Sequence, residues 1–153
     1  MAMTTDRLRD LAGDGRFDPH PPPVPLDLRA TGLNNTYRFF IFLELEGEFL
    51  QFRTREYHSC LLDNPSLDAT LKVLGELNFG LRLVKFGWDP SDGEIVASVD
   101  AWVCDGDLTR AQFNQMAKSF LTNIDLQYPR IDATIETGED PGEVDSPEWV
   151  GRV

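Results

Sequence analysis

The stretch YRFFIFLELEGEFLQFRTR, residues 37–55, constrains the fold more than any other part of the sequence. Apolar residues recur on both sides of Glu46 and Gly47, where glycine allows the positive φ of a tight turn. The pattern predicts a β-hairpin with a two-residue loop, in which Leu43 lies opposite Leu50.

The two faces of this hairpin differ in composition, because side chains of a strand point alternately to its two sides. One face suits a core and comprises Phe39, Ile41, Leu43, Leu45, Leu50 and Phe52. The other face mixes Phe40, Phe42 and Phe49 with Glu44, Gln51 and Arg53. Phenylalanines on such a mixed face indicate a surface that something must cover.

A second hairpin is predicted at residues 81–103, with DPSDG, residues 89–93, as its loop. An EF-hand interpretation of this loop fails, because only Asp92 would occupy a ligand position. Pairing that keeps apolar residues together places Phe86 opposite Val96. The predicted core-facing set is Leu81, Leu83, Ile95, Ala97, Val99, Ala101 and Val103.

Two helices are predicted, one after each hairpin. Residues 64–80 show leucines at helical spacing. Residues 108–128 begin with a capping box formed by Thr109 and Gln112, and Pro129 is expected to end the helix. The predicted buried stripe of this second helix is Ala111, Phe113, Met116, Phe120, Leu121 and Ile124.

The order strand, strand, helix, strand, strand, helix predicts an α+β fold: an antiparallel sheet of two hairpins with both main helices on one face. We divide the chain into a proline-rich N-terminal segment (1–36), an α+β domain (37–130) and a flexible or loosely docked acidic C-terminal tail (131–153). Within the first segment, residues 4–13 can form one or two helical turns, and residues 24–30 an edge strand.

Charge and hydropathy exclude several functions. The net charge of −12 disfavours nucleic acid and anionic membranes as partners. No secretory signal is visible, and no run approaches the roughly 20 apolar residues that span a bilayer. Cys60 and Cys104 are too few for a disulfide scaffold, so we expect reduced thiols and a cytoplasmic location.

Residues that could carry chemistry are few. His20 lies in the proline run, and no phosphate-binding loop, nucleophile elbow or dinucleotide fingerprint is present. We therefore expect no enzyme activity, no catalytic residues, no cofactor and no bound metal. One alternative is a metal-binding protein or small enzyme that uses His58, Cys60 and Cys104. A small-molecule sensor is a further alternative.

Three stretches carry a resemblance to a known family: FLELEGEFLQF, LNFGLRLVKFGWDPSDGEIVASVDAWV and LTRAQFNQMAKSFLTNIDLQYP. Together they resemble the YbjN-like family, whose fold is that of type III secretion chaperones, over roughly residues 37–129. The resemblance implies a regulatory or chaperone-like role and dimers that hold partner segments, and it brings no catalytic signature.

These observations converge on an interaction surface made of aromatic residues on the outward side of the sheet. Its predicted members are Phe40, Phe42, Phe49, Phe86, Trp88 and Trp102. We expect a non-enzymatic protein-interaction module, chaperone-like or regulatory, that forms a homodimer and binds an unidentified protein partner through this face. Coverage of the face by the chain's own termini is the competing interpretation.

Overall fold

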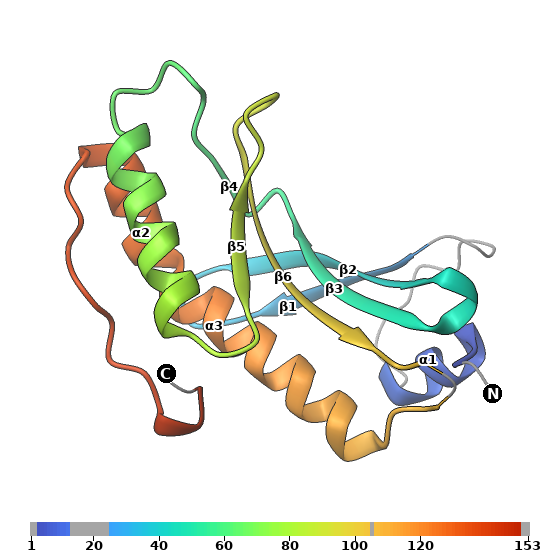
Figure 1. Ribbon diagram of the computed structural model, residues 1–153. Helices are drawn as coiled ribbons and strands as arrows, with labels where there is room; N and C mark the ends of the chain where they lie inside the picture. The colour runs from blue at the N-terminus through green and yellow to red at the C-terminus, as the bar shows by residue number, and fades with distance from the viewer. Residues whose placement is uncertain (1–2, 13–24, 105, 151–153) are drawn as a thin grey trace.

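The computed structural model describes residues 3–12, 25–104 and 106–150, and within them six β-strands form one antiparallel sheet (Figure 1). The strands are β1 (Leu26–Thr31), β2 (Thr36–Glu44), β3 (Phe49–Arg55), β4 (His58–Ser59), β5 (Lys85–Trp88) and β6 (Glu94–Trp102). The α-helices are α1 (Thr5–Ala12), α2 (Leu67–Gly80) and α3 (Arg110–Thr137). The strand order is β1-β2-β3-β6-β4, and β5 also pairs with β6. The predicted α+β class is confirmed.

The core lies between one face of the sheet and the helices (Figure 1). Phe120 of α3 packs edge-on against Phe39 of β2, with ring centroids 5.5 Å apart. Val73 of α2 and Leu8 of α1 belong to the same buried cluster. The two main helices therefore cover the same side of the sheet, as the hydrophobic pattern predicts.

The first hairpin has the predicted register, since Leu43 lies opposite Leu50. Its loop is longer than expected, because Leu45 and Glu46 take positive φ angles of 49° and 57°. The N–H of Glu48 closes the loop by donating to the Leu45 carbonyl at 3.1 Å. Leu45 consequently leaves the strand and is 59% exposed, so its predicted place in the core is wrong.

The segment before the first hairpin contains two of the elements that its sequence suggests. β1 is an edge strand that pairs with β2, and α1 forms a short helix. The α1 helix is capped by Thr4, whose hydroxyl accepts a hydrogen bond from the N–H of Arg7 at 3.1 Å. His20 and the proline run around it lie outside the described residues, apart from Pro25.

The second hairpin differs from its predicted register by one residue, since Phe86 pairs with Ala97 rather than Val96. Leu83 takes a positive φ of 67°, and the N–H of Val84 donates to the Arg82 carbonyl at 2.8 Å. This tight turn shortens β5 and rotates it. Leu83 is therefore 59% exposed instead of core-facing, whereas Val84 is buried.

A side chain of α2 holds this altered register. The Asn78 amide accepts from the N–H of Phe86 at 2.7 Å and donates to its carbonyl at 2.9 Å. Asn78 thus satisfies both backbone groups of Phe86, as a neighbouring strand would. The α2 helix itself begins at Leu67, later than predicted, because the N–H of Leu67 first closes a turn with the Asn64 carbonyl at 3.0 Å.

The last helix starts as predicted, since both hydrogen bonds of the Thr109–Gln112 capping box are present. It does not stop at Pro129, which lies inside a helix that ends at Thr137. A proline in a helix leaves the carbonyl four residues earlier without its N–H donor. Here that carbonyl belongs to Asp125, and it accepts a hydrogen bond of 2.8 Å from the Asn34 side chain. This contact from a distant turn compensates for the proline.

Residues 138–150 fold back beside α2 instead of trailing freely (Figure 1). The guanidinium of Arg130 binds Asp140 through two hydrogen bonds of 2.8 and 2.7 Å. Further along, the Lys118 ammonium lies 4.1 Å from the centre of the Trp149 ring, and Val150 is 1% exposed. We call residues 138–150 the C-terminal strap; the first residues of the predicted tail, 131–137, belong to α3.

Candidate functional site

The side of the sheet that faces away from the core is the candidate site, and we call it the outer face. Strand alternation places Phe40 and Phe42 of β2, Phe49 of β3 and Trp102 of β6 on it. Each of the three described α-helices contributes its buried side chains to the core on the opposite side. Within the described part of the chain, no helix covers the outer face.

The four aromatic residues form a continuous diagonal, which we call the aromatic stripe: Phe40, Phe42, Phe49 and Trp102. The rings of Phe40 and Phe42 contact each other edge-on at 5.7 Å. Phe49 lies directly opposite Trp102, and their rings are 5.2 Å apart. Phe42 and Phe49 are diagonal neighbours across the β2–β3 pair, within reach of large side chains. Trp102 is 65% exposed.

Charged residues flank the aromatic stripe, with arginines at one end, where Arg38 also pairs with Asp27 at 2.6 Å, and glutamates at the other. Arg38 and Arg55 lie over the Phe40 ring, at 6.0 and 5.3 Å from its centre. The other end of the same hairpin carries the acidic Glu44 and Glu48. The antiparallel register makes this gradient, because Arg55 pairs with Arg38 while Glu44 pairs with Phe49. Sequence alternation could have identified part of it, since Arg38 and Glu44 are an even number of residues apart on one strand and therefore share a face.

A shallow hollow continues the outer face beside the stripe. It has a volume of about 290 Å³ and is lined by Gln51, Arg53, Asn78, Lys85, Phe86, Gly87, Val96 and Ser98. The Asp100 carboxylate borders it, accepting a hydrogen bond of 2.7 Å from Gln51 and pairing with Lys85. The hollow therefore has a polar rim next to an apolar stripe.

Two of the predicted surface residues lie elsewhere. Phe86 is 3% exposed and belongs to the core, because the one-residue change in register turns its side chain inward. Trp88 lies on the same inner side, and its indole N–H donates to the Cys60 carbonyl at 2.8 Å. Phe40, Phe42, Phe49 and Trp102 remain on the outer face, and their role in binding stays a prediction.

His58 is packed as an aromatic core residue. Its ring stacks on Tyr128 at 4.3 Å and contacts Tyr57 edge-on at 4.5 Å. Burial lowers the pKa of its imidazole to about 4, so the ring is neutral near pH 7. Nδ1 is 3.8 Å from a carboxylate oxygen of Asp132, and Nε2 is buried without a hydrogen-bond partner in the described structure.

The structure does not bring together the three residues of the metal-site alternative. His58 pairs with Ile95 at the start of β6, whereas Cys104 follows the end of that strand. At about 3.3 Å per residue, the strand separates them by roughly 25 Å. Cys60 is a buried free thiol 4.0 Å from the Thr70 hydroxyl, and Cys104 is exposed. Among the residues described, no group of three or more His, Cys, Asp or Glu side chains could hold a metal ion.

The fold and the outer face define the class: an α+β domain with an open, aromatic sheet surface. The chain belongs to the YbjN family, described as "Putative bacterial sensory transduction regulator", whose model matches residues 25–133. No curated protein and no solved structure matches the chain. The matched range contains the whole sheet, whereas α1 and the C-terminal strap lie outside it. Across the three described ranges, no helix combines the length and apolarity needed to cross a membrane.

Proposed function

We propose that this protein is a non-enzymatic regulatory module, with chaperone-like or regulatory binding of a partner protein through the aromatic stripe. The observation that carries the proposal is the position of Trp102, 65% exposed beside Phe49 on a face that no described helix covers. The family's description as a regulator of sensory transduction supports a regulatory role. A cytoplasmic location is part of the proposal and is supported by the two free thiols.

We propose further that a second copy of the chain covers part of this face. The outer face carries arginines at one end of the β2–β3 hairpin and glutamates at the other. Two copies packed face to face with their strands antiparallel would place Arg55 of one near Glu44 of the other. Such an arrangement repeats one contact twice about a two-fold axis, which is the commonest symmetry of protein dimers.

The size of the aromatic stripe suits the centre of an interface. Covered aromatic side chains bury about 150–250 Å² each, whereas a stable interface needs roughly 800 Å² from each partner. The stripe would form the apolar centre, and the surrounding charged residues would form the polar rim. Trp102 and the arginines over Phe40 are of the residue types that dominate interface energies.

The partner-binding claim is tested by affinity capture with matched variants. Tagged wild type, Phe42→Asp and Leu33→Asp would be used to capture proteins from cells of the source organism. Leu33 is 93% exposed in the β1–β2 turn, so its substitution places the same charge away from the stripe. We expect a partner captured by wild type and Leu33→Asp and lost with Phe42→Asp. Equal capture by all three would contradict the assignment of the surface.

A further inference from the structure

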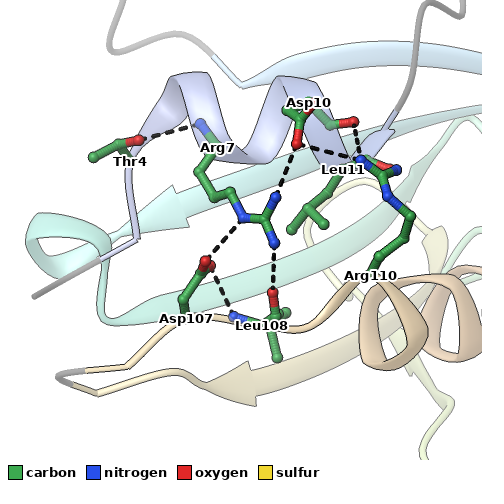
Figure 2. Close-up of polar contacts among 7 residues, drawn as sticks. All are labelled: Thr4, Arg7, Asp10, Leu11, Asp107, Leu108 and Arg110. Carbon is green, nitrogen blue, oxygen red and sulfur yellow. Dashed lines mark hydrogen bonds and ion pairs between the residues drawn. The ribbon is translucent and has the colours of Figure 1, made fainter.

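The polar contacts of the N-terminal helix α1 with the rest of the protein involve few residues (Figure 2), whereas its buried side chains belong to the main core cluster. Leu8 and Leu11 are 1% and 2% exposed, and Met3 is also buried. The Arg7 guanidinium donates to the Asp107 carboxylate at 2.8 Å and to the Leu108 carbonyl at 3.2 Å. All of the polar contacts to the body in this close-up fall on residues 107–110, just before and at the start of α3.

The far end of α1 is held by a side chain from α3. The Arg110 guanidinium donates to the carbonyls of Asp10 and Leu11 at 3.2 and 3.3 Å. It also pairs with the Asp10 carboxylate at 3.2 Å. A cation at a helix C-terminus interacts favourably with the last carbonyl groups. The α1 helix is thus bound at both ends by residues 107–110.

The helical structure of α1 depends on its contacts with the rest of the protein. A helix of eight residues is not stable alone in water. The ion pairs of Arg7 and Arg110 are partly exposed, and exposed pairs contribute little. None of the strand pairs of the sheet involves α1, so its departure would break no strand pairing.

The docking site lies within the part of the chain that the family model matches, whereas α1 lies outside it. The matched domain therefore presents this site without supplying its occupant. When α1 leaves, the apolar positions of Leu8 and Leu11 open beside the free Asp107 carboxylate and the Arg110 guanidinium. Vacated in this way, these positions would form an apolar groove suited to an amphipathic helix, with a charge of each sign to orient it.

We propose that α1 is a displaceable self-ligand that blocks a second protein-binding site. The occupant that the site fits is a partner helix with the pattern Arg-Leu-x-Asp-Leu, which residues 7–11 display. Its arginine binds Asp107, its aspartate binds Arg110, and its two leucines fill the groove. This site is distinct from the aromatic stripe, so the chain has two surfaces, one of which is autoinhibited.

The test uses the full chain carrying both Leu8→Glu and Leu11→Glu, a double variant in which α1 should no longer occupy its site. The probe is a fluorescein-labelled peptide of residues 1–16. Fluorescence anisotropy should show that the peptide binds the double variant at least about tenfold more tightly than wild type, because tethered α1 competes at an effective concentration of roughly millimolar. A Leu33→Glu chain, with the substitution far from the site, should bind the peptide as weakly as wild type does. Trp102→Asp should also leave peptide binding unchanged.

Exchanging the charges of Arg7 and Asp107 tests whether these two residues contact each other in the complex. A peptide carrying Arg7→Asp should bind the emptied chain more weakly than the unmodified peptide does, because the introduced aspartate faces Asp107, and an added Asp107→Arg in the chain should restore the affinity. Failure of the unmodified peptide to bind the emptied chain overturns the proposal. A wild-type dimer that becomes monomeric with Leu8→Glu and Leu11→Glu also overturns it, since α1 would then be exchanged between two copies.

Hydrogen exchange on wild type provides an independent measurement. The amides of Leu8, Leu11 and Ala12 should exchange much faster than those of β3, because α1 opens by itself. Exchange of α1 and β3 amides at one common rate would show that α1 is inseparable from the fold, and so would unfolding of the double variant. Either result overturns the proposal.

Discussion

The hydroxyl of Tyr37 in β2 donates a hydrogen bond of 2.7 Å to the Asp125 carboxylate in α3. The same carboxylate accepts from the N–H groups of Leu33 and Asn34 at 2.8 and 2.9 Å. Gly32 approaches so closely that a Cβ there would collide with Asp125. The β1–β2 turn is therefore held by hydrogen bonds to α3 at Asp125, one helical turn before Pro129.

Asp125→Asn should destabilise the protein by about 1.5–3 kcal/mol at pH 7, because the turn loses hydrogen bonds to a charged acceptor. Tyr37→Phe removes only one of these bonds and should cost about 0.5–1.5 kcal/mol. Urea denaturation measures both values. An Asp125→Asn variant as stable as wild type would contradict the account of this turn.

The stabilisation by Asp125 should depend on pH. Burial raises the pKa of this carboxyl, but hydrogen bonds from Asn34, Tyr37 and Leu33 outweigh burial and lower the pKa overall. A carboxyl whose pKa is lower in the folded state stabilises the fold above its unfolded pKa of about 3.9. The difference in stability between wild type and Asp125→Asn should therefore shrink as the pH falls below about 4.

Because of His58, the free energy of unfolding should decrease as the pH is lowered from 7 to 5. Its folded pKa of about 4 lies below the unfolded value, so in this range the unfolded chain binds a proton that the folded chain does not. Wild type should lose about 2 kcal/mol over this range through His58. His58→Leu should lose much less, as measured by urea denaturation at each pH. Parallel pH profiles for the two proteins would show that His58 is not buried as described.

Phe120→Ala should cost about 3–5 kcal/mol, because Phe120 is fully buried between Phe39 and Phe52. Thr109→Ala removes only the capping box and should cost about 0.5–2 kcal/mol. Thermal denaturation of the two variants shows which substitution destabilises the protein more. Equal losses would mean that the buried stripe of α3 is misassigned.

Gly93→Ala should be more harmful than Gly142→Ala. Both glycines have positive φ, at 78° and 103°, so alanine is strained at either. At Gly93 an added Cβ would also lie 2.7 Å from the Cys60 carbonyl oxygen, whereas nothing lies within 4 Å at Gly142. The difference between the melting temperatures of the two variants measures the steric contribution at Gly93, because the backbone strain is common to both. A smaller loss at Gly93 would contradict the close contact between the hairpin loop and Cys60.

Local patterns predicted most of the elements correctly. The alternation across residues 37–55 gave the register of the β2–β3 pair, and the spacing of Thr109 and Gln112 identified the start of α3. Both signals depend on residues close in sequence, so the sequence alone contains them. The same alternation placed Phe40, Phe42 and Phe49 on the outer face.

The errors arose where a contact or backbone conformation outside the periodic pattern decides the local structure. Pro129 stays helical because Asn34 binds the carbonyl that proline leaves unpaired. Phe86 turns inward because Asn78 satisfies its backbone and Leu83 adopts a positive φ. Neither contact leaves a periodic signal, so the surface assigned to Phe86 and Trp88 could not be corrected from sequence. The α1 docking site was missed for the same reason, since Arg7 and Asp107 are a hundred residues apart.

Sedimentation equilibrium at high micromolar concentration tests the central claim most directly, with wild type, Trp102→Asp and the control Leu33→Asp. Trp102 and Leu33 are both exposed, so circular dichroism should show that all three proteins are folded. We predict that wild type and Leu33→Asp sediment as dimers and that Trp102→Asp sediments as a monomer. A monomeric wild type, or a Trp102→Asp variant that dimerises as wild type does, would contradict the assignment of the aromatic stripe to a shared interface.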